Sequence, residues 1–140
     1  PAPRTKQKTI LIVDNEPDFT TVVTKMLEHE GYQVIFTNSG KSCLEIAAKQ
    51  KTDLIILDIL MPDIDGLAVR GLLAESAETK DIPIVFVTVS PEMHHEVLGE
   101  GPHGSIVRIF PKPIVVDHFK KWLTDFFNSR QKSQPEQKVA

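Results

Sequence analysis

The stretch that decides the fold is Leu54–Gly66, whose sequence is LIILDILMPDIDG. Its first four residues are large and apolar without alternation, which predicts a strand buried on both faces of a parallel sheet. Asp58 ends this apolar run, and Met61-Pro62-Asp63 then predicts a turn ahead of a helix. Because ligands of open α/β sheets bind just beyond the carboxyl ends of strands, Asp58 is either a site residue or a turn-capping acid. The rest of the chain decides between the two.

The same order of strand and helix recurs along the chain. Besides the central strand, we expect strands at residues 9–13, 32–37, 83–87 and 106–110. Each strand precedes a helical pattern, and the weakest of these patterns begins at Ser90. This alternation predicts an α/β fold, with a parallel sheet, helices on both faces and right-handed crossovers.

Size and composition place the chain among globular proteins of one domain. Its 140 residues suit one domain, and 41% apolar with 25% charged residues is ordinary for that class. The net charge of −3 argues against direct nucleic-acid binding. The single cysteine excludes an internal disulfide and favours a cytoplasmic location. No apolar run approaches the roughly 20 residues that cross a bilayer, and no signal peptide is expected.

Composition also sets the expected domain boundaries. Residues 1–8 are polar, basic and proline-bearing, so we expect a flexible leader there. Residues 9–127 hold the units of strand and helix and are expected to form the folded domain. Residues 128–140 contain almost no apolar side chains, which predicts a disordered tail or linker.

The ends of the expected strands carry chemical groups that complement one another. These groups belong to Asp14 and Asn15 after the first strand, Asp58 on the third, Thr88 on the fourth and Lys112 after the fifth. Because all strands of a parallel sheet end at the same edge, acids, a hydroxyl and an ammonium group are expected to meet there. Each residue alone has an ordinary structural explanation, such as helix capping. Their coincidence favours a shared site.

This combination of groups suits phosphoryl transfer to a carboxylate. Asp58 lies on the central strand and is the natural nucleophile. Asp14, Asp58 and a backbone carbonyl could supply oxygen ligands for Mg²⁺, which relieves the repulsion between clustered acids. The metal and Lys112 could stabilise the charge on the transferred group, and Thr88 could donate a hydrogen bond to the acyl phosphate.

Four motifs in order resemble the response-regulator receiver domain of two-component signalling, in the CheY-like superfamily. They are Ile10–Pro17 (ILIVDNEP), Leu57–Gly66 (LDILMPDIDG), Val87-Thr88 and Pro111-Lys112-Pro113. The resemblance covers residues 9–127. It implies a flavodoxin-like, doubly wound parallel sheet of five strands in the order 2-1-3-4-5, with five helices. It also implies a signalling domain that assists its own phosphorylation and is not an enzyme.

The resemblance assigns a role to each site residue. Asp58 is implied to accept a phosphoryl group from the phosphohistidine of a histidine kinase or phosphotransfer protein. The implied cofactor is Mg²⁺, or Mn²⁺, and its implied ligands are Asp14, Asn15, Asp58 and the backbone carbonyl of Leu60. Thr88 and Lys112 are implied to contact the phosphoryl group. The peptide bond between Lys112 and Pro113 is implied to be cis.

Three positions depart from the family pattern. Asn15 stands where an acid is usual, so we expect weaker metal binding unless Glu16 compensates. Val89 stands where a small residue is usual, beside the phosphoryl pocket, and could slow the access of water or small donors. Ile109 occupies the position of the switch aromatic, and neighbouring Phe110 has the opposite strand parity. The coupling between threonine and aromatic ring that is usual in the family is therefore put in question.

The same residues leave alternatives for partners and function. The surface best suited to an output domain or partner protein is formed by the fourth helix, fifth strand and fifth helix, and a homodimer is one alternative. A degenerate receiver that binds partners without phosphorylation is favoured by Asn15, Val89 and Ile109 and disfavoured by the intact strand-end groups. A phosphatase of the dehalogenase type needs an acid where this chain has Leu60. The nucleotide-binding patterns G-x-G-x-x-G and G-x-x-x-x-G-K-S/T are absent.

Overall fold

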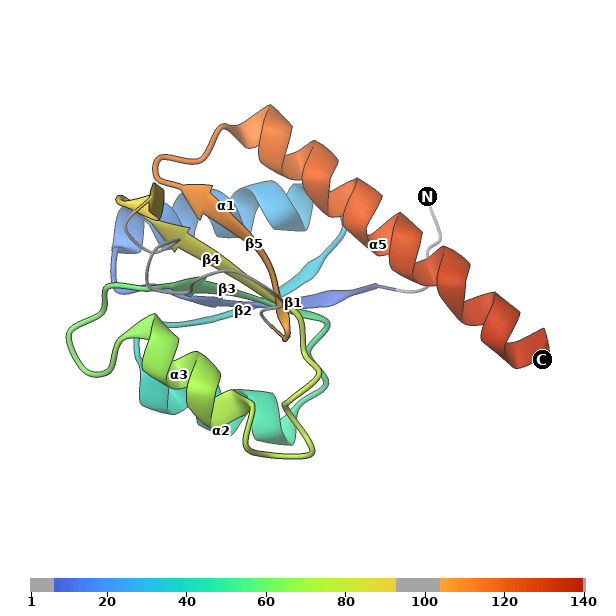
Figure 1. Ribbon diagram of the computed structural model, residues 1–140. Coiled ribbons are helices and arrows are strands. Elements are labelled where there is room, and N and C mark those ends of the chain that lie inside the picture. The colour runs from blue at the N-terminus through green and yellow to red at the C-terminus, as the bar shows by residue number, and fades with distance from the viewer. Residues whose placement is uncertain (1–6, 93–103, 140) are drawn as a thin grey trace.

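The structure, a computed structural model, describes residues 7–92 and 104–139. Its centre is a parallel sheet whose strands lie in the order β2-β1-β3-β4-β5 (Figure 1). The strands are β1 (Thr9–Val13), β2 (Gln33–Thr37), β3 (Leu54–Asp58), β4 (Ile84–Thr88) and β5 (Ile106–Pro111). The predicted α/β class and strand order are therefore confirmed.

Helices cover both faces of this sheet. They are α1 (Pro17–His29), α2 (Gly40–Lys49), α3 (Gly66–Leu73) and α5 (Val116–Val139). Figure 1 shows α1 and α5 on one face and α2 and α3 on the other. The part of the chain that is described has four helices and not the predicted five. The remaining helix was expected after Ser90, where Pro91 and Glu92 are helical and residues 93–103 lie outside the described residues.

The predicted leader and the predicted tail lie at the two ends of the chain. Most of the expected leader, residues 1–8, lies outside the described residues. The segment expected as a disordered tail or linker, residues 128–140, starts within α5, which continues to Val139, and its role stays a prediction. Arg, Gln, Lys and Glu in this segment favour a helix, whereas Pro135 opposes one. Among the described residues, no helix is both long and apolar enough to cross a membrane.

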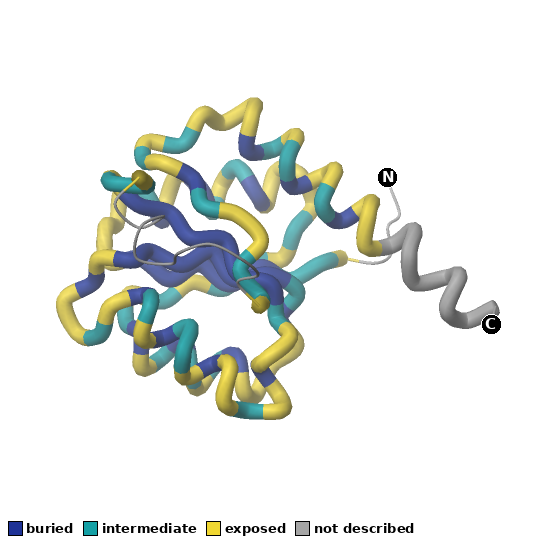
Figure 2. Tube along the Cα trace, in the orientation of Figure 1, coloured by how far each residue is buried: buried dark blue, intermediate teal, exposed yellow. Residues whose placement is uncertain are grey.

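The core lies in two layers, one on each face of the sheet (Figure 2). Successive strand residues point to opposite faces, so Ile10 and Ile12 pack toward α1 and α5 while Leu11 and Val13 pack toward α2 and α3. All residues of β3 and β4 are buried, which explains why their sequences are apolar without alternation. This double burial holds the carboxyl ends of the strands in fixed positions.

The loop that follows Asp58 is held at several points. The Gly66 amide donates to the Ile59 carbonyl at 2.7 Å, and the Asp65 carboxylate caps α3 by accepting from the Ala68 amide at 2.9 Å. The Asp63 carboxylate accepts a hydrogen bond from the Gly40 amide at 3.0 Å, which ties the loop to the start of α2. The chain therefore leaves β3 along a defined path.

Gly66 is expected to tolerate no larger side chain. A Cβ atom there would collide with the backbone oxygen of Asp58 and lie 2.8 Å from the Ile59 Cα. We expect Gly66→Ala to lower the free energy of unfolding by about 1–3 kcal/mol, as measured by urea denaturation.

Gly71 of the same helix is the matched control. A Cβ atom there meets nothing within 4 Å among the described residues, so Gly71→Ala is expected to leave stability unchanged or raise it by up to about 1 kcal/mol. Equal unfolding free energies for the two variants would contradict the close approach of α3 to the end of β3.

Candidate functional site

Three charged groups from distant parts of the sequence meet at the carboxyl edge of the sheet. Asp14 follows β1, Asp58 ends β3 and Lys112 follows β5. The Lys112 Nζ lies 2.9 Å from the Asp14 Oδ2 and 3.7 Å from the Asp58 Oδ2. Thr88 ends β4, between the strands that lead to Asp58 and Lys112. The charged groups at these strand ends therefore lie close together, as the sequence predicts.

Backbone hydrogen bonds orient the site side chains. The Glu16 amide donates to the Asp14 Oδ1 at 2.9 Å, and the Leu60 amide donates to the Asp58 Oδ1 at 3.3 Å. The Lys112 amide donates to the Thr88 carbonyl at 2.9 Å, which joins the ends of β4 and β5. In both acids one carboxylate oxygen is held by the backbone, so the other is directed toward Lys112.

The lysine is held by more than the residues predicted for the site. Glu16 extends from the turn before α1, and its Oε1 lies 2.6 Å from the Lys112 Nζ. The sequence suggested Glu16 only as a substitute metal ligand, because spacing along a turn does not reveal where a long side chain points. The Lys112–Pro113 peptide bond is cis, as predicted. Lys112 therefore faces three carboxylates at once.

Burial and charge together make the Asp58 carboxylate costly to ionise. Its side chain is almost wholly buried, with 5% of the residue exposed. Burial, and after it the negative charge of Asp14, raise the pKa of Asp58 to about 6 against the opposing effect of Lys112. Burial alone would lower the pKa of Lys112, but its hydrogen bonds to Asp14 and Glu16 prevail and the pKa is raised. Negative charge is in excess at this edge.

The oxygen atoms present fit a hard divalent cation. The Asp14 Oδ2 is buried and lies 2.9 Å from the Lys112 Nζ, in a position that a cation already occupies. Within residues 7–92 and 104–139, no group of three or more His, Cys, Asp or Glu side chains is placed to hold a metal. A metal bound between Asp14 and Asp58 would therefore need amide, backbone or water oxygens as well. Mg²⁺ accepts such a mixed oxygen set.

Neither residue named as a switch places an aromatic ring beside Thr88. Phe110 is buried on the face of the sheet covered by α5, and its ring centre lies 4.8 Å from that of Phe119 and 5.5 Å from that of Trp122. Ile109 points to the opposite face, where it packs against the other core layer. Phe110 is therefore part of the core.

An apolar groove of about 370 Å³ opens beside the lysine. Its walls come from α1, from the residue after β4 and from the segment between β5 and α5. Val89, which is 65% exposed, and Val22 of α1 lie along it together with Lys112. The branched residue at position 89 therefore lies at the rim of the site and not inside it.

The raised pKa of Asp58 predicts a pH-dependent cost in stability. An acid whose folded pKa is above its unfolded value stabilises the fold below pH 4, and this contribution is lost as pH rises toward 6. In metal-free buffer at pH 7.5, the free energy of unfolding of Asp58→Asn is therefore expected to be about 1–2 kcal/mol higher than that of the wild type.

The difference between the two proteins is expected to shrink as the pH falls from 7.5 to 4. Urea denaturation in the presence of a chelator measures it at each pH. A constant difference across this range, or a less stable Asp58→Asn at pH 7.5, would show that Asp58 ionises without strain.

Comparison with known proteins identifies relatives over most of the chain. Residues 10–122 match the response regulator receiver domain family. Protein PilH of Pseudomonas aeruginosa is 35% identical over 91 residues, which cover 65% of this chain and 75% of PilH. The polar-differentiation response regulator DivK of Brucella ovis is 33% identical over 120 residues, which cover 84% of this chain and 98% of DivK. The chain spans 28% of a probable cyclic di-GMP phosphodiesterase of Vibrio cholerae, with 35% identity.

A solved receiver structure has the same fold. The receiver domain of a sensor histidine kinase from Pseudomonas aeruginosa, which has a magnesium ion coordinated in its active-site cleft, gives a TM-score of 0.75 at 22% identity. The match covers 85% of this chain and 96% of that domain. Together with the sequence relatives, these findings show that the chain belongs to the response regulator receiver domain family of two-component signalling.

Proposed function

We propose that this receiver accepts a phosphoryl group on Asp58 from the phosphohistidine of a histidine kinase or phosphotransfer protein, in a Mg²⁺-dependent reaction. The observation that carries the proposal is the placement of the Lys112 Nζ between the buried carboxylates of Asp14 and Asp58. A buried pair of acids with one shared lysine is costly to a structure and suited to a site that receives charge.

The transfer assigns a distinct task to each side chain. Asp58 has a pKa of about 6, so at neutral pH it is mostly a carboxylate and can attack phosphorus. The new P–O bond forms as the P–N bond to the donor imidazole breaks, and the imidazole nitrogen then takes up a proton. Lys112 offsets the negative charge on the transferred oxygens, and the Thr88 hydroxyl donates a hydrogen bond to one of them.

The metal would be held by Asp14, Asp58, the Asn15 side chain and the backbone carbonyl of Leu60. Mg²⁺, or Mn²⁺ in its place, supplies positive charge to the phosphoryl oxygens when bound. Asn15 is exposed and contributes a neutral oxygen where an acid would contribute a charge. The magnesium ion in the cleft of the Pseudomonas aeruginosa receiver supports this assignment by analogy of fold.

The donor protein would dock on the apolar groove beside Lys112. This groove is lined by Lys112 and exposes apolar residues from α1 and from both strand-end segments. A donor helix that buries these residues would gain binding free energy beside Lys112. A cytoplasmic location follows from such a partner.

Phosphorylation would then change how the domain binds an output partner. The phosphoryl group adds about −1.5 to −2 charges at the carboxyl edge, and we expect the surface formed by the fourth helix, β5 and α5 to respond to it. Because Phe110 is packed in the core and Ile109 is aliphatic, this change would be transmitted without rotation of an aromatic side chain at either position.

A second candidate is a degenerate receiver that binds partners regardless of phosphorylation. Asn15 and Ile109 favour it, because they alter the metal site and the switch position. The ion pair of Lys112 with Asp14 and its approach to Asp58 disfavour it, since an unused site has no need of buried acids.

Incubation with acetyl phosphate and Mg²⁺ separates the two candidates. We expect intact-mass measurement to detect one added phosphoryl group on the wild type and none on Asp58→Asn. Asp81→Asn, which removes an exposed acid before β4, is the matched control and is expected to behave as the wild type. A wild-type chain that gains no mass under these conditions would favour the degenerate receiver.

The neutral ligand at position 15 predicts weak metal binding that one substitution improves. Asn15→Asp adds a carboxylate beside Asp14, so its affinity for Mg²⁺ is expected to rise about tenfold, as measured by calorimetric titration. Asn128→Asp, which adds the same charge at an exposed position of α5, is expected to leave the affinity unchanged. Equal affinities in all three proteins would remove Asn15 from the metal site.

A further inference from the structure

The sheet has two edges, and the chain protects them differently. β5 forms one edge and carries Arg108 and Pro111, and its register with β4 shifts between Ile84 and Val85. A charge, a proline and a bulge are three devices by which natural proteins prevent an edge strand from pairing with another chain. β2 forms the other edge with the sequence QVIFT, which has no charge and no proline, and its register with β1 is regular.

The backbone of β2 offers hydrogen-bonding groups on its outer side. The Gln33 amide donates to the Lys8 carbonyl at 2.9 Å, and the Thr37 carbonyl accepts from the Asp14 amide at 3.1 Å, so both residues face β1 with their backbone groups. Because these groups alternate in direction along a strand, those of Val34 and Phe36 face away from the sheet.

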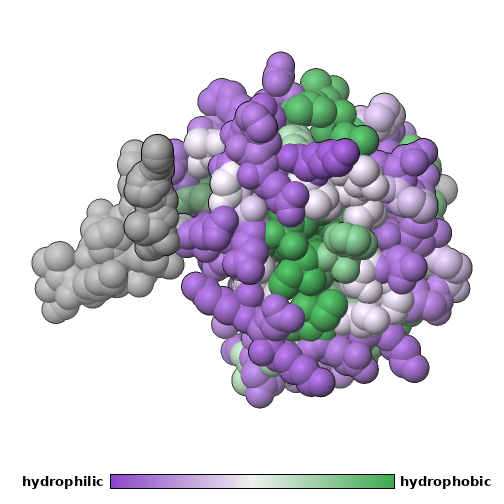
Figure 3. All heavy atoms as spheres, turned by 180° about the vertical axis from the view of Figure 1, so that it is seen from behind, coloured by the Kyte–Doolittle hydropathy of each residue, from purple (hydrophilic) through white to green (hydrophobic). Residues whose placement is uncertain are grey.

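One large apolar side chain of this edge strand is exposed. Phe36 is 60% exposed, although it has the same strand parity as Val34, which packs against the core under α1. Figure 3 shows an apolar patch bordered by hydrophilic side chains on the face that lies behind in Figure 1, where β2 forms the edge. An exposed aromatic on an unprotected edge strand indicates a surface that another chain covers.

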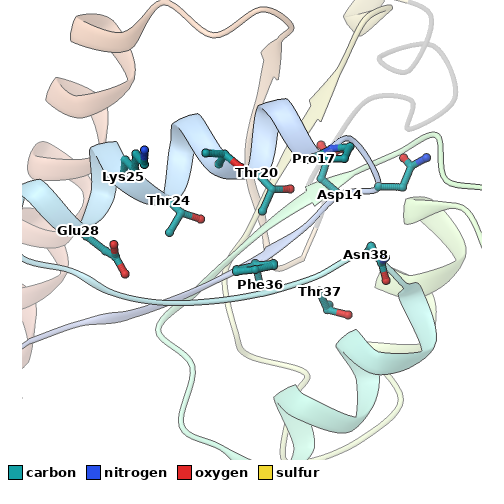
Figure 4. A pocket seen from close by; sticks show the side chains of 11 residues that line it. Asp14, Pro17, Thr20, Thr24, Lys25, Glu28, Phe36, Thr37 and Asn38 are labelled. Carbon is teal, nitrogen blue, oxygen red and sulfur yellow. The ribbon is translucent and has the colours of Figure 1, made fainter.

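Space for an incoming side chain lies next to Phe36. A groove of about 580 Å³ separates α1 from β2, and Figure 4 shows Thr20 and Thr24 of α1 on the side of the groove that faces the Phe36 ring. The Thr24 Oγ1 is buried and has no hydrogen-bond partner among the described residues. Lys25 and Glu28, of opposite charge, line the outer part of the same groove.

We propose that β2 pairs with the β2 strand of a second copy of this chain, antiparallel and centred on Ile35. In this register Val34 lies opposite Phe36 of the second copy, and the two residues exchange both of their outward hydrogen bonds. The Phe36 ring enters the groove beneath α1 of the second copy. The two sheets become one continuous sheet across the interface.

The strand's own sequence favours a second copy over a foreign strand. The register in which the two copies exchange backbone hydrogen bonds also places Val34 of one copy beside Phe36 of the other. In the same register, the polar residue Gln33 lies opposite Thr37 of the other copy. No like charges face each other in β2. This pairing does not rest on phosphorylation of Asp58.

Sedimentation velocity over a range of concentrations tests the proposal. The wild type is expected to form a dimer, and Phe36→Lys is expected to weaken dimerisation by at least about tenfold, since it places a charge in the apolar pair. Val107→Lys, which adds the same charge to exposed β5 at the other edge, is the matched control and is expected to dimerise as the wild type. Circular dichroism checks that each variant is folded.

Amide hydrogen exchange of the wild type, followed by NMR, gives a second measurement that needs no variant. The Val34 and Phe36 amides are expected to become protected as the protein concentration rises, and Asp58→Asn is expected to give the same result. A chain that stays monomeric, a dimer unaffected by Phe36→Lys, or unprotected amides in the dimer would each overturn the pairing. A monomer that binds an unrelated apolar strand peptide would overturn it too, because it would assign this edge to a foreign partner.

Discussion

The constraint on which the site depends is the burial of two carboxylates with one lysine between them. Asp14 and Asp58 end neighbouring strands that are covered on both faces, so neither acid can withdraw into water. The Lys112 Nζ approaches both and is also drawn to Glu16, which leaves negative charge in excess. The raised pKa of Asp58 expresses that excess, and a site of this kind binds cations and transferred groups that rebalance it.

Most of this arrangement could be predicted from the sequence, because the signals are local and the geometry of a parallel sheet does the rest. Unbroken apolar runs identified the strands, and the alternation with helices gave the parallel sheet. Once strands end at a common edge, Asp14, Asp58 and Lys112 must approach one another, whatever their separation along the chain. The roles assigned to Asn15 and Leu60 rest on resemblance and stay predictions.

The features that the sequence did not reveal depend on side-chain direction or on weak local preferences. Glu16 reaches Lys112 because of the angle at which the turn enters α1, and no pattern of residue types encodes that angle. The course of α5 to Val139 was not predicted either, because the composition of residues 128–140 contains no apolar pattern that marks a helix. The exposure of Phe36 follows from the place of β2 at the sheet edge, and the apolar run at residues 32–37 does not show which of its side chains stays uncovered.

Titration of the Asp58 carboxyl group by carbon-13 NMR, in metal-free protein, tests most directly whether this edge holds excess negative charge. Burial and the neighbouring Asp14 raise the pKa of Asp58 to about 6, so its side-chain carboxyl resonance is expected to shift with a midpoint near that pH. Addition of Mg²⁺ is expected to move the midpoint downward, since a cation favours the ionised form. A midpoint near 4 or below without metal would contradict the physical basis proposed for the site.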